Sequence, residues 1–261
     1  MADKIERLAA ALAEAWRNGA TVPLPASDAA APASRAEAYA VQDRMAELIG
    51  EPVVGWKVGA TVKAVQRLEG HDGPILGRLF APRLLTSPAT VPAALVDGGK
   101  VECEIAFRFT ADLPVRRDRR YTPEEIAPLL VLHPAIELTA SRYAAGARRP
   151  TTFDVVADNG NAGALVVGPG VEDWRDLPLA TLAIEARIDG GEAIEVYGGE
   201  FRLDPVEAVI DTASELAARG IGFSAGQYLS TGSLTLPTPL RAGQTLVARF
   251  EGLGTLRAAL G

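Results

Sequence analysis

From residue 53 onward the chain consists of short apolar runs that glycine and proline interrupt every few residues. Runs of this length are typical of strands rather than long helices. They predict strands at VVGWKVG (53–59), VECEIAFRF (101–109), PAIEL (134–138), GALVVG (163–168), TLAIEARID (181–189), AIEVYG (193–198), YLSTGSL (228–234) and TLVARFEG (245–252). Many strands with few helices favour a mixed, strand-dominated α+β domain over a repeated βαβ fold.

Helices are predicted before these strands begin. Residues 4–18 carry apolar side chains along one stripe, which indicates an amphipathic helix. Ser34 and Glu37 have the spacing of a capping box and predict the start of a second helix. The stretch 22–34 between them is rich in proline, alanine and serine, and we expect it to be a connector.

Two further helices interrupt the strand-rich part. One is expected to begin at Thr122, and the other to run over 204–219, where Asp204-Pro205 begins it and Gly220 ends it. The DGG at 189–191 predicts a hairpin turn. We therefore divide the chain into a helical N-terminal segment, residues 1–50, and a main domain, residues 51–261.

Composition and charge exclude several classes of function. The net charge is −7 and no basic run alternates with aromatic residues, so no nucleic-acid partner is expected. No apolar stretch approaches the roughly 20 residues that cross a bilayer, and the N-terminus lacks the apolar core of a signal peptide. Cys103 is the chain's one cysteine. It therefore forms no internal disulfide, and a reducing cytoplasm is the expected location.

Glutamates in the predicted strand 101–109 are the first candidates for chemistry. Successive side chains of a strand point to opposite faces, so Glu102 and Glu104 share one face while Cys103 points to the other, into the core. Two interpretations stay open at this point. The acids face water on a half-exposed strand, or they form a pair of carboxylates directed at a cation.

A third acid bears on that choice. Glu137 lies inside the apolar run VLHPAIEL, where an isolated ionised carboxylate would be costly. If Glu137 approached Glu102 and Glu104, their like charges would repel and raise at least one pKa unless a cation lay among them. Hard oxygen ligands that leave positions open for water or substrate suit Mg²⁺ or Mn²⁺.

Other polar residues in apolar surroundings are candidates for substrate binding. Lys57 lies between glycines in an apolar strand, and either extends its amine to solvent or directs it at an anion. Two polar turns could line a pocket through Asp158, Asn159, Asn161, Thr231 and Ser233, although ordinary turn chemistry explains both stretches equally well.

These pieces occur in an order that resembles a known family. GWKVGAT, VECEIAF, PAIEL, DVVADNGNAG and ARGIGFSAGQYLSTGSL are similar to motifs of the fumarylacetoacetate hydrolase superfamily, and most of all to its 2-keto-4-pentenoate hydratase and 4-oxalocrotonate decarboxylase branch. The resemblance covers roughly residues 50 to 261. It implies a mixed β-roll of wrapped sheets with the site in the mouth of the roll, and a helical N-terminal segment is also typical of that branch.

The resemblance also implies a site and a reaction. It implies Mg²⁺ or Mn²⁺ held by Glu102, Glu104 and Glu137, and Lys57 beside a bound 2-oxo acid. The expected reaction is addition of water to a short 2-hydroxydienoic or 2-oxo-enoic acid during aromatic-compound catabolism, with Asp158 or a metal-bound water moving the proton. Family members are oligomers from dimers to decamers, and a sister decarboxylase or hydratase is a further expected partner.

Departures from the family pattern keep other reactions open. Hydratases often have NAS where this chain has Asn159-Gly160-Asn161, and an acid in the loop that here contains Ile75 and Leu76. A 4-oxalocrotonate-type decarboxylase is the first alternative. A second is a hydrolase that cleaves a carbon–carbon bond of an acylpyruvate-like diketone acid, with Glu69 and His71 as its dyad. A third is a homologue that binds metal and ligand without catalysis.

Overall fold

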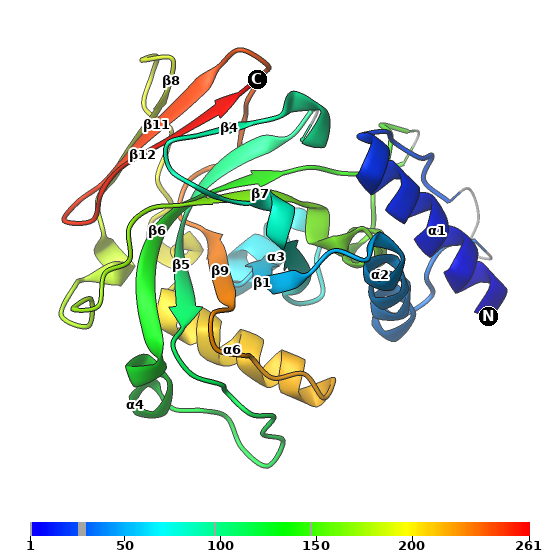
Figure 1. The fold of residues 1–261 in the computed structure, drawn as a ribbon, viewed down its shortest axis with the longest axis horizontal. Coiled ribbons are helices and arrows are strands. Elements are labelled where there is room, and N and C mark those ends of the chain that lie inside the picture. Colours follow the sequence, from blue (N-terminus) through cyan, green and yellow to red (C-terminus); the bar gives the residue numbers. More distant parts are fainter. Residues whose placement is uncertain (1, 26–29, 97, 147) are drawn as a thin grey trace.

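The structure of the chain is a computed structural model that describes residues 2–25, 30–96, 98–146 and 148–261 (Figure 1). Two helices, α1 (Ala2–Asn18) and α2 (Arg35–Ile49), pack against each other at one end of the molecule. Both were predicted. The expected connector between them has no helix or long strand where it is described, and its residues 26–29 lie outside the described part.

The start of α2 forms only half of the predicted capping box. The Ser34 hydroxyl accepts a hydrogen bond from the Glu37 amide at 3.2 Å. The Glu37 carboxylate, however, accepts from the Ala33 amide and from the Lys4 amine instead of the Ser34 amide. Glu37 therefore links the start of α2 to α1.

The larger sheet is eight-stranded and mixed, in the order β2–β1–β9–β5–β6–β7–β3, with β10 pairing β5. Strand β1 is parallel to β9 and β3 to β7, while the other pairs are antiparallel. The strands are β1 (Val53–Gly59), β2 (Ile75–Phe80), β3 (Leu84–Thr86), β5 (Lys100–Phe109), β6 (Leu130–Thr139), β7 (Ala162–Val167), β9 (Tyr228–Ser233) and β10 (Thr238–Pro239).

A second, four-stranded sheet lies beside the first, at the upper left of Figure 1, in the order β4–β12–β11–β8. Its strands are β4 (Ala89–Val91), β8 (Ile184–Ile188), β11 (Thr245–Phe250) and β12 (Gly254–Leu260). The turn at 189–191 forms as predicted, with the Gly191 amide bonded to the Ile188 carbonyl at 2.9 Å. The strand predicted at 193–198 is wrong, because this segment makes only isolated bridges.

Three of the remaining helices are short, while α6 (Pro205–Ala218) has 14 residues and packs against β9. The short ones are α3 (Lys63–Glu69), α4 (Pro123–Ile126) and α5 (Thr152–Ala157), with 3-10 turns at Ala81–Arg83, Ala93–Leu95, Ala127–Leu129, Asn159–Asn161, Leu179–Thr181 and Gly199–Phe201. The predicted helices at Thr122 and Asp204 are α4 and α6, and the side chain of Asp204 accepts hydrogen bonds from the first turn of α6.

One apolar cluster extends from the N-terminal helices into the sheets. Trp16 of α1 contacts Phe80 of β2 edge to face, and both belong to the same buried cluster as Phe107 of β5. The helical segment therefore shares its core with the sheets, and the division at residue 50 stays a prediction. The α+β class with mixed, curled sheets and a helical N-terminus is confirmed. Among the described residues, no helix combines the length and apolar character that crossing a bilayer requires.

Candidate metal and substrate site

The alternation predicted for β5 is observed. Cys103 is 1% exposed and belongs to the core, and burial raises the pKa of its thiol to about 12. Glu102 and Glu104 lie on the opposite face. Strand β6 pairs antiparallel with β5 so that Glu137 is directly opposite Glu102. This register brings two acids from one strand and one from its neighbour together.

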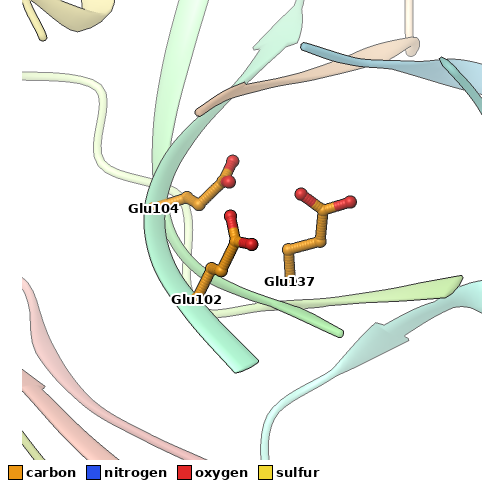
Figure 2. A group of neighbouring side chains, drawn as sticks. All are labelled: Glu102, Glu104 and Glu137. Atoms are coloured by element: carbon orange, nitrogen blue, oxygen red, sulfur yellow. The ribbon is translucent and has the colours of Figure 1, made fainter. Parts of the chain in front are cut away.

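The three carboxylates point into a common space, as Figure 2 shows. One oxygen from each lies within 4.8 Å of the others. Within the described part of the chain, Oε1 of Glu104 and Oε2 of Glu137 are buried without a hydrogen-bond donor, and Oε1 of Glu137 has only the Lys57 amine beside it, at 3.2 Å. Buried carboxylate oxygens without donors are costly unless a cation compensates them. The predicted convergence is confirmed, and its donor set fits a hard divalent ion.

The electrostatics of the cluster lead to the same conclusion. Burial, together with repulsion from Glu137 and Glu102, raises the pKa of Glu104 well above its ordinary value. Burial and the charge of Glu137 raise the pKa of Glu102 to about 7. Without a cation the protein therefore retains protons that free glutamates would have lost, and a bound cation would replace those protons.

The amine of Lys57 lies beside this cluster and is not directed to solvent. Lys57 is 4% exposed. Its Nζ lies 3.2 Å from Oε1 of Glu137 and donates a hydrogen bond to the Gly160 carbonyl at 3.0 Å. Burial opposes its charge, but attraction by Glu137, Glu102 and Glu104 outweighs that effect and raises its pKa. A buried cation thus lies next to the three acids, as an anion-binding role requires.

The raised pKa of Glu102 predicts how stability depends on pH. Between the ordinary value of 4.5 and about 7, the folded metal-free protein binds more protons than the unfolded chain, so its free energy of unfolding falls as pH rises. We expect a loss of about 2–3 kcal/mol across this window. Denaturant unfolding in EDTA at pH 5 and 7.5 measures it, and Glu102→Gln should reduce the slope. An equal slope in that variant would contradict the assignment.

Of the three acids, Glu102 lines a cavity of about 300 Å³. Lys57 and Glu102 are part of its wall, together with apolar residues such as Val65 and Leu203, and with Ser233. Ser233 is thus placed where substrate binding was predicted, although its hydroxyl also donates to the Thr235 carbonyl at 2.6 Å. Thr231 is not among the lining residues; it is fully buried and donates to the Ile105 carbonyl, which contradicts its predicted role.

Ser230 and Gly232 hold Glu104 and were missed by the sequence analysis. The Ser230 hydroxyl and the Gly232 amide both donate to Oε2 of Glu104, at 2.5 Å and 3.0 Å. The register between β5 and β9 shifts between Glu104 and Ala106, so one extra residue of β9 fits into the ladder. This bulge changes which residues of STGS face the acids, and alternation alone could not reveal it.

Two residues predicted at the pocket rim instead hold the turn in place. Asp158 is fully buried, and its carboxylate accepts hydrogen bonds from Arg142 and Ser141. The side chain of Asn159 bonds both the amide and the carbonyl of Arg78. Neither Asp158 nor Asn159 lines the cavity. These contacts give both side chains a structural part in the turn, and the catalytic role of Asp158 and the substrate-binding role of Asn159 stay predictions.

Glu69 and His71 lie at the same cavity. Nε2 of His71 is 3.4 Å from Oε2 of Glu69, and Nδ1 of His71 is 3.1 Å from the Thr152 hydroxyl. Both Glu69 and His71 line the wall. A histidine paired with a carboxylate can accept or donate a proton near neutral pH, so the pair could act on a ligand in this cavity.

Comparisons with known proteins agree with this geometry. Residues 46–260 match the model of the C-terminal domain of fumarylacetoacetate (FAA) hydrolase. The chain is 31% identical over 259 residues to 2-keto-4-pentenoate hydratase of Burkholderia vietnamiensis (strain G4 / LMG 22486), covering 98% of this chain and 97% of that one. It is 30% identical over 230 residues to 4-oxalocrotonate decarboxylase of Pseudomonas sp. (strain CF600), covering 85% and 84%.

A solved structure is similar over the whole chain. It is 4-oxalocrotonate decarboxylase from Pseudomonas putida G7, complexed with magnesium and adipate. The TM-score is 0.87 at 26% identity, covering 100% of this chain and 98% of that one. The same decarboxylase complexed with calcium and acetate gives a TM-score of 0.86 at 25% identity. The predicted roll and its helical N-terminal segment are therefore confirmed at the level of the fold.

Proposed function

The chain belongs to the fumarylacetoacetate hydrolase family, and on that premise we propose that it is a metal-dependent lyase that adds water to a short 2-hydroxydienoic or 2-oxo-enoic acid. The observation that carries the proposal is the cluster of Glu102, Glu104 and Glu137 with Lys57 beside it, which reaches a small cavity through Lys57 and Glu102. Hydratases among the relatives support this reaction.

Glu102, Glu104 and Glu137 would hold Mg²⁺ or Mn²⁺. The decarboxylase relative in complex with magnesium and with calcium supports a divalent ion at such a site. A bound ion would act as a Lewis acid that stabilises negative charge developing on the substrate's 2-oxo oxygen. The protein's own part is to hold the three carboxylates in register across β5 and β6, with Glu104 and Glu137 buried and Glu102 facing the cavity.

Lys57 would bind the substrate carboxylate. Its amine is buried and already bonded on one side to the Gly160 carbonyl, so its position is fixed before a ligand enters. A buried cation held in this way attracts an anion more strongly than a solvated lysine does. The cavity volume of about 300 Å³ suits a small acid. These features support a short 2-oxo acid as the ligand class.

Membership of the family supports expectations about the location, the oligomeric state and the pathway of the protein. We expect a cytoplasmic homo-oligomer, of any size from dimer to decamer, that acts in the catabolism of aromatic compounds. A sister decarboxylase or hydratase is the expected partner enzyme, because loss of CO₂ from an unsaturated 2-oxo-enedioic acid leaves the dienol that a hydratase uses. Sedimentation of the purified chain, alone and mixed with such a decarboxylase, tests both expectations.

Turnover of two substrates tests the reaction. We expect the chain with Mg²⁺ or Mn²⁺ to consume 2-hydroxypenta-2,4-dienoate, seen as loss of the dienol absorbance, and to act poorly on 4-oxalocrotonate. The reverse preference would make it a decarboxylase, the alternative that the second relative supports. Metal binding without turnover of either compound would identify a non-catalytic homologue.

A second candidate function is cleavage of a carbon–carbon bond in an acylpyruvate-like acid. The pairing of Glu69 with His71 on the cavity wall favours it, because such a pair can activate water for attack on a carbonyl.

His71→Ala separates the two functions. A hydrolase would lose about 10²–10⁴-fold in kcat, whereas we expect a hydratase to keep turnover within about threefold, because its proton transfer does not depend on His71. Steady-state kinetics with the dienoate and with an acylpyruvate measure the effect. Thr152→Ala is the matched control, because it removes the hydroxyl that contacts His71 and leaves the imidazole in place. Loss of dienoate turnover in His71→Ala alone would assign His71 to the hydratase reaction.

A further inference from the structure

The turn at Asn159–Asn161 has a strained backbone. Three consecutive residues have left-handed φ angles, 52° at Asn159, 62° at Gly160 and 56° at Asn161. Asparagine tolerates this region better than most residues, but each such position still carries a cost. Strain of this kind persists only where the surroundings impose it, and it is often found at sites of function.

The surroundings of this turn do impose it. Beneath it, Arg142 donates to the carboxylate and the carbonyl of Asp158 and to the Ala162 carbonyl. On one side the turn packs against β2 so closely that a Cβ at Gly77 would lie 2.2 Å from the Asn159 carbonyl oxygen. Both backbone groups of Asn161 are also bonded, its amide to the Asp158 carbonyl and its carbonyl to the Ala140 amide.

One polar atom of the turn has no partner. Oδ1 of Asn161 is buried without a hydrogen-bond donor in the described part of the chain. Asn161 lines the cavity that contains Lys57 and Glu102, and the residue before it supplies the carbonyl that Lys57 contacts. An unpaired buried acceptor is destabilising. A ligand that donates a hydrogen bond there would recover that cost.

The chemistry of the ligand decides which group can be the donor. In the hydrated product, a 4-hydroxy-2-oxo acid, the carboxylate and the 2-oxo group are acceptors only, so they cannot pair with Oδ1. Addition of water at C4 creates a hydroxyl group, which can donate. We propose that Asn161 is a specificity-determining residue that accepts a hydrogen bond from the C4 hydroxyl of a 4-hydroxy-2-oxo acid; this inference rests on the proposed function.

Two ligands that differ by one hydroxyl test the assignment. They are 4-hydroxy-2-oxopentanoate and 2-oxopentanoate, whose dissociation constants are measured by calorimetry with the full chain and Mg²⁺. Wild type should prefer the hydroxy acid by about fivefold, the value of one neutral hydrogen bond. Asn161→Gly, which fits a positive φ without strain, should bind both equally. Asn161→Asp keeps an acceptor oxygen and should keep the preference, because any repulsion of the common carboxylate cancels in the ratio.

Each other outcome is decisive. Equal binding of both acids by wild type overturns the assignment, and so does a preference that Asn161→Gly retains. If Asn161→Gly binds both acids more weakly by the same factor and keeps the preference, Asn161 contacts the 2-oxo carboxylate end that the two ligands share. That result also overturns the assignment. If neither acid binds wild type with Mg²⁺, the proposed function fails and the assignment fails with it. Circular dichroism and thermal unfolding confirm that the variants are folded.

Discussion

Glu104→Gln is expected to weaken Mg²⁺ binding by at least about 100-fold, since loss of an outer-shell partner alone costs about 10–100-fold and Glu104 belongs to the cluster itself. The amide oxygen of glutamine can take the place of Oε2, where Ser230 and Gly232 donate. Its amino group then occupies the position of Oε1 and presents hydrogen atoms where a cation needs an oxygen. Turnover of the dienoate should fall with metal occupancy. Calorimetric titration with Mg²⁺ and Mn²⁺ measures the binding directly.

The same substitution should make the metal-free protein more stable at pH 8. It removes the charge of a buried acid, including an oxygen that has no donor in the described part of the chain, and so relieves repulsion of Glu102 and Glu137. Ser230→Ala provides a graded comparison, because it leaves the carboxylate in place and should cost about tenfold in metal affinity. Glu69→Gln, on the cavity wall but outside the cluster, should change that affinity by less than about threefold. Equal Mg²⁺ binding by wild type and Glu104→Gln would remove Glu104 from the site.

The metal cluster could be predicted because it depends on local periodicity. Alternation along β5 places Glu102 and Glu104 on one face regardless of the rest of the fold, and an acid in an apolar strand requires compensation wherever it lies. The register that sets Glu137 opposite Glu102 could not be read from the sequence, because it depends on how distant strands pair. The resemblance to a family supplied that step.

The errors have physical causes of the same kind. We expected Thr231 to bind the substrate and gave no role to Ser230 or Gly232. Because of the bulge in β9, Ser230 and Gly232 contact Glu104 while Thr231 faces the core. Strand β2 includes Ile75, which we expected in a loop. Strand β12 was not expected at all, because its alanines and glycine give a weak strand signal. Asp158 lies in a polar turn by sequence, and only its contact with Arg142 reveals that it is buried.

Asp158→Asn is expected to lower the free energy of unfolding by about 3–5 kcal/mol, because it leaves the buried guanidinium of Arg142 without its counter-charge. The side chains of Arg142 and Asp158 are 4% and 0% exposed, and their ion pair is 2.5 Å long. The guanidinium of Arg142 also lies over the Trp16 ring of α1, 5.3 Å from its centroid. The Arg142–Asp158 ion pair therefore connects the turn to the N-terminal helices. Urea unfolding of wild type and variant measures the difference.

The matched control is Glu185→Gln, which breaks an ion pair with Arg187. The side chain of Arg187 is 42% exposed and that of Glu185 is 55% exposed. That change should cost less than about 1 kcal/mol, because water screens exposed charges. The pH profile of kcat/KM then separates a structural role of Asp158 from a role in proton transfer. If Asp158 is structural, the folded variant should keep the inflections of wild type even where a displaced turn lowers the rate. Unchanged stability with loss of one inflection would restore Asp158 as the proton-transfer group, and the turn at Asn159–Asn161 would need another source of rigidity.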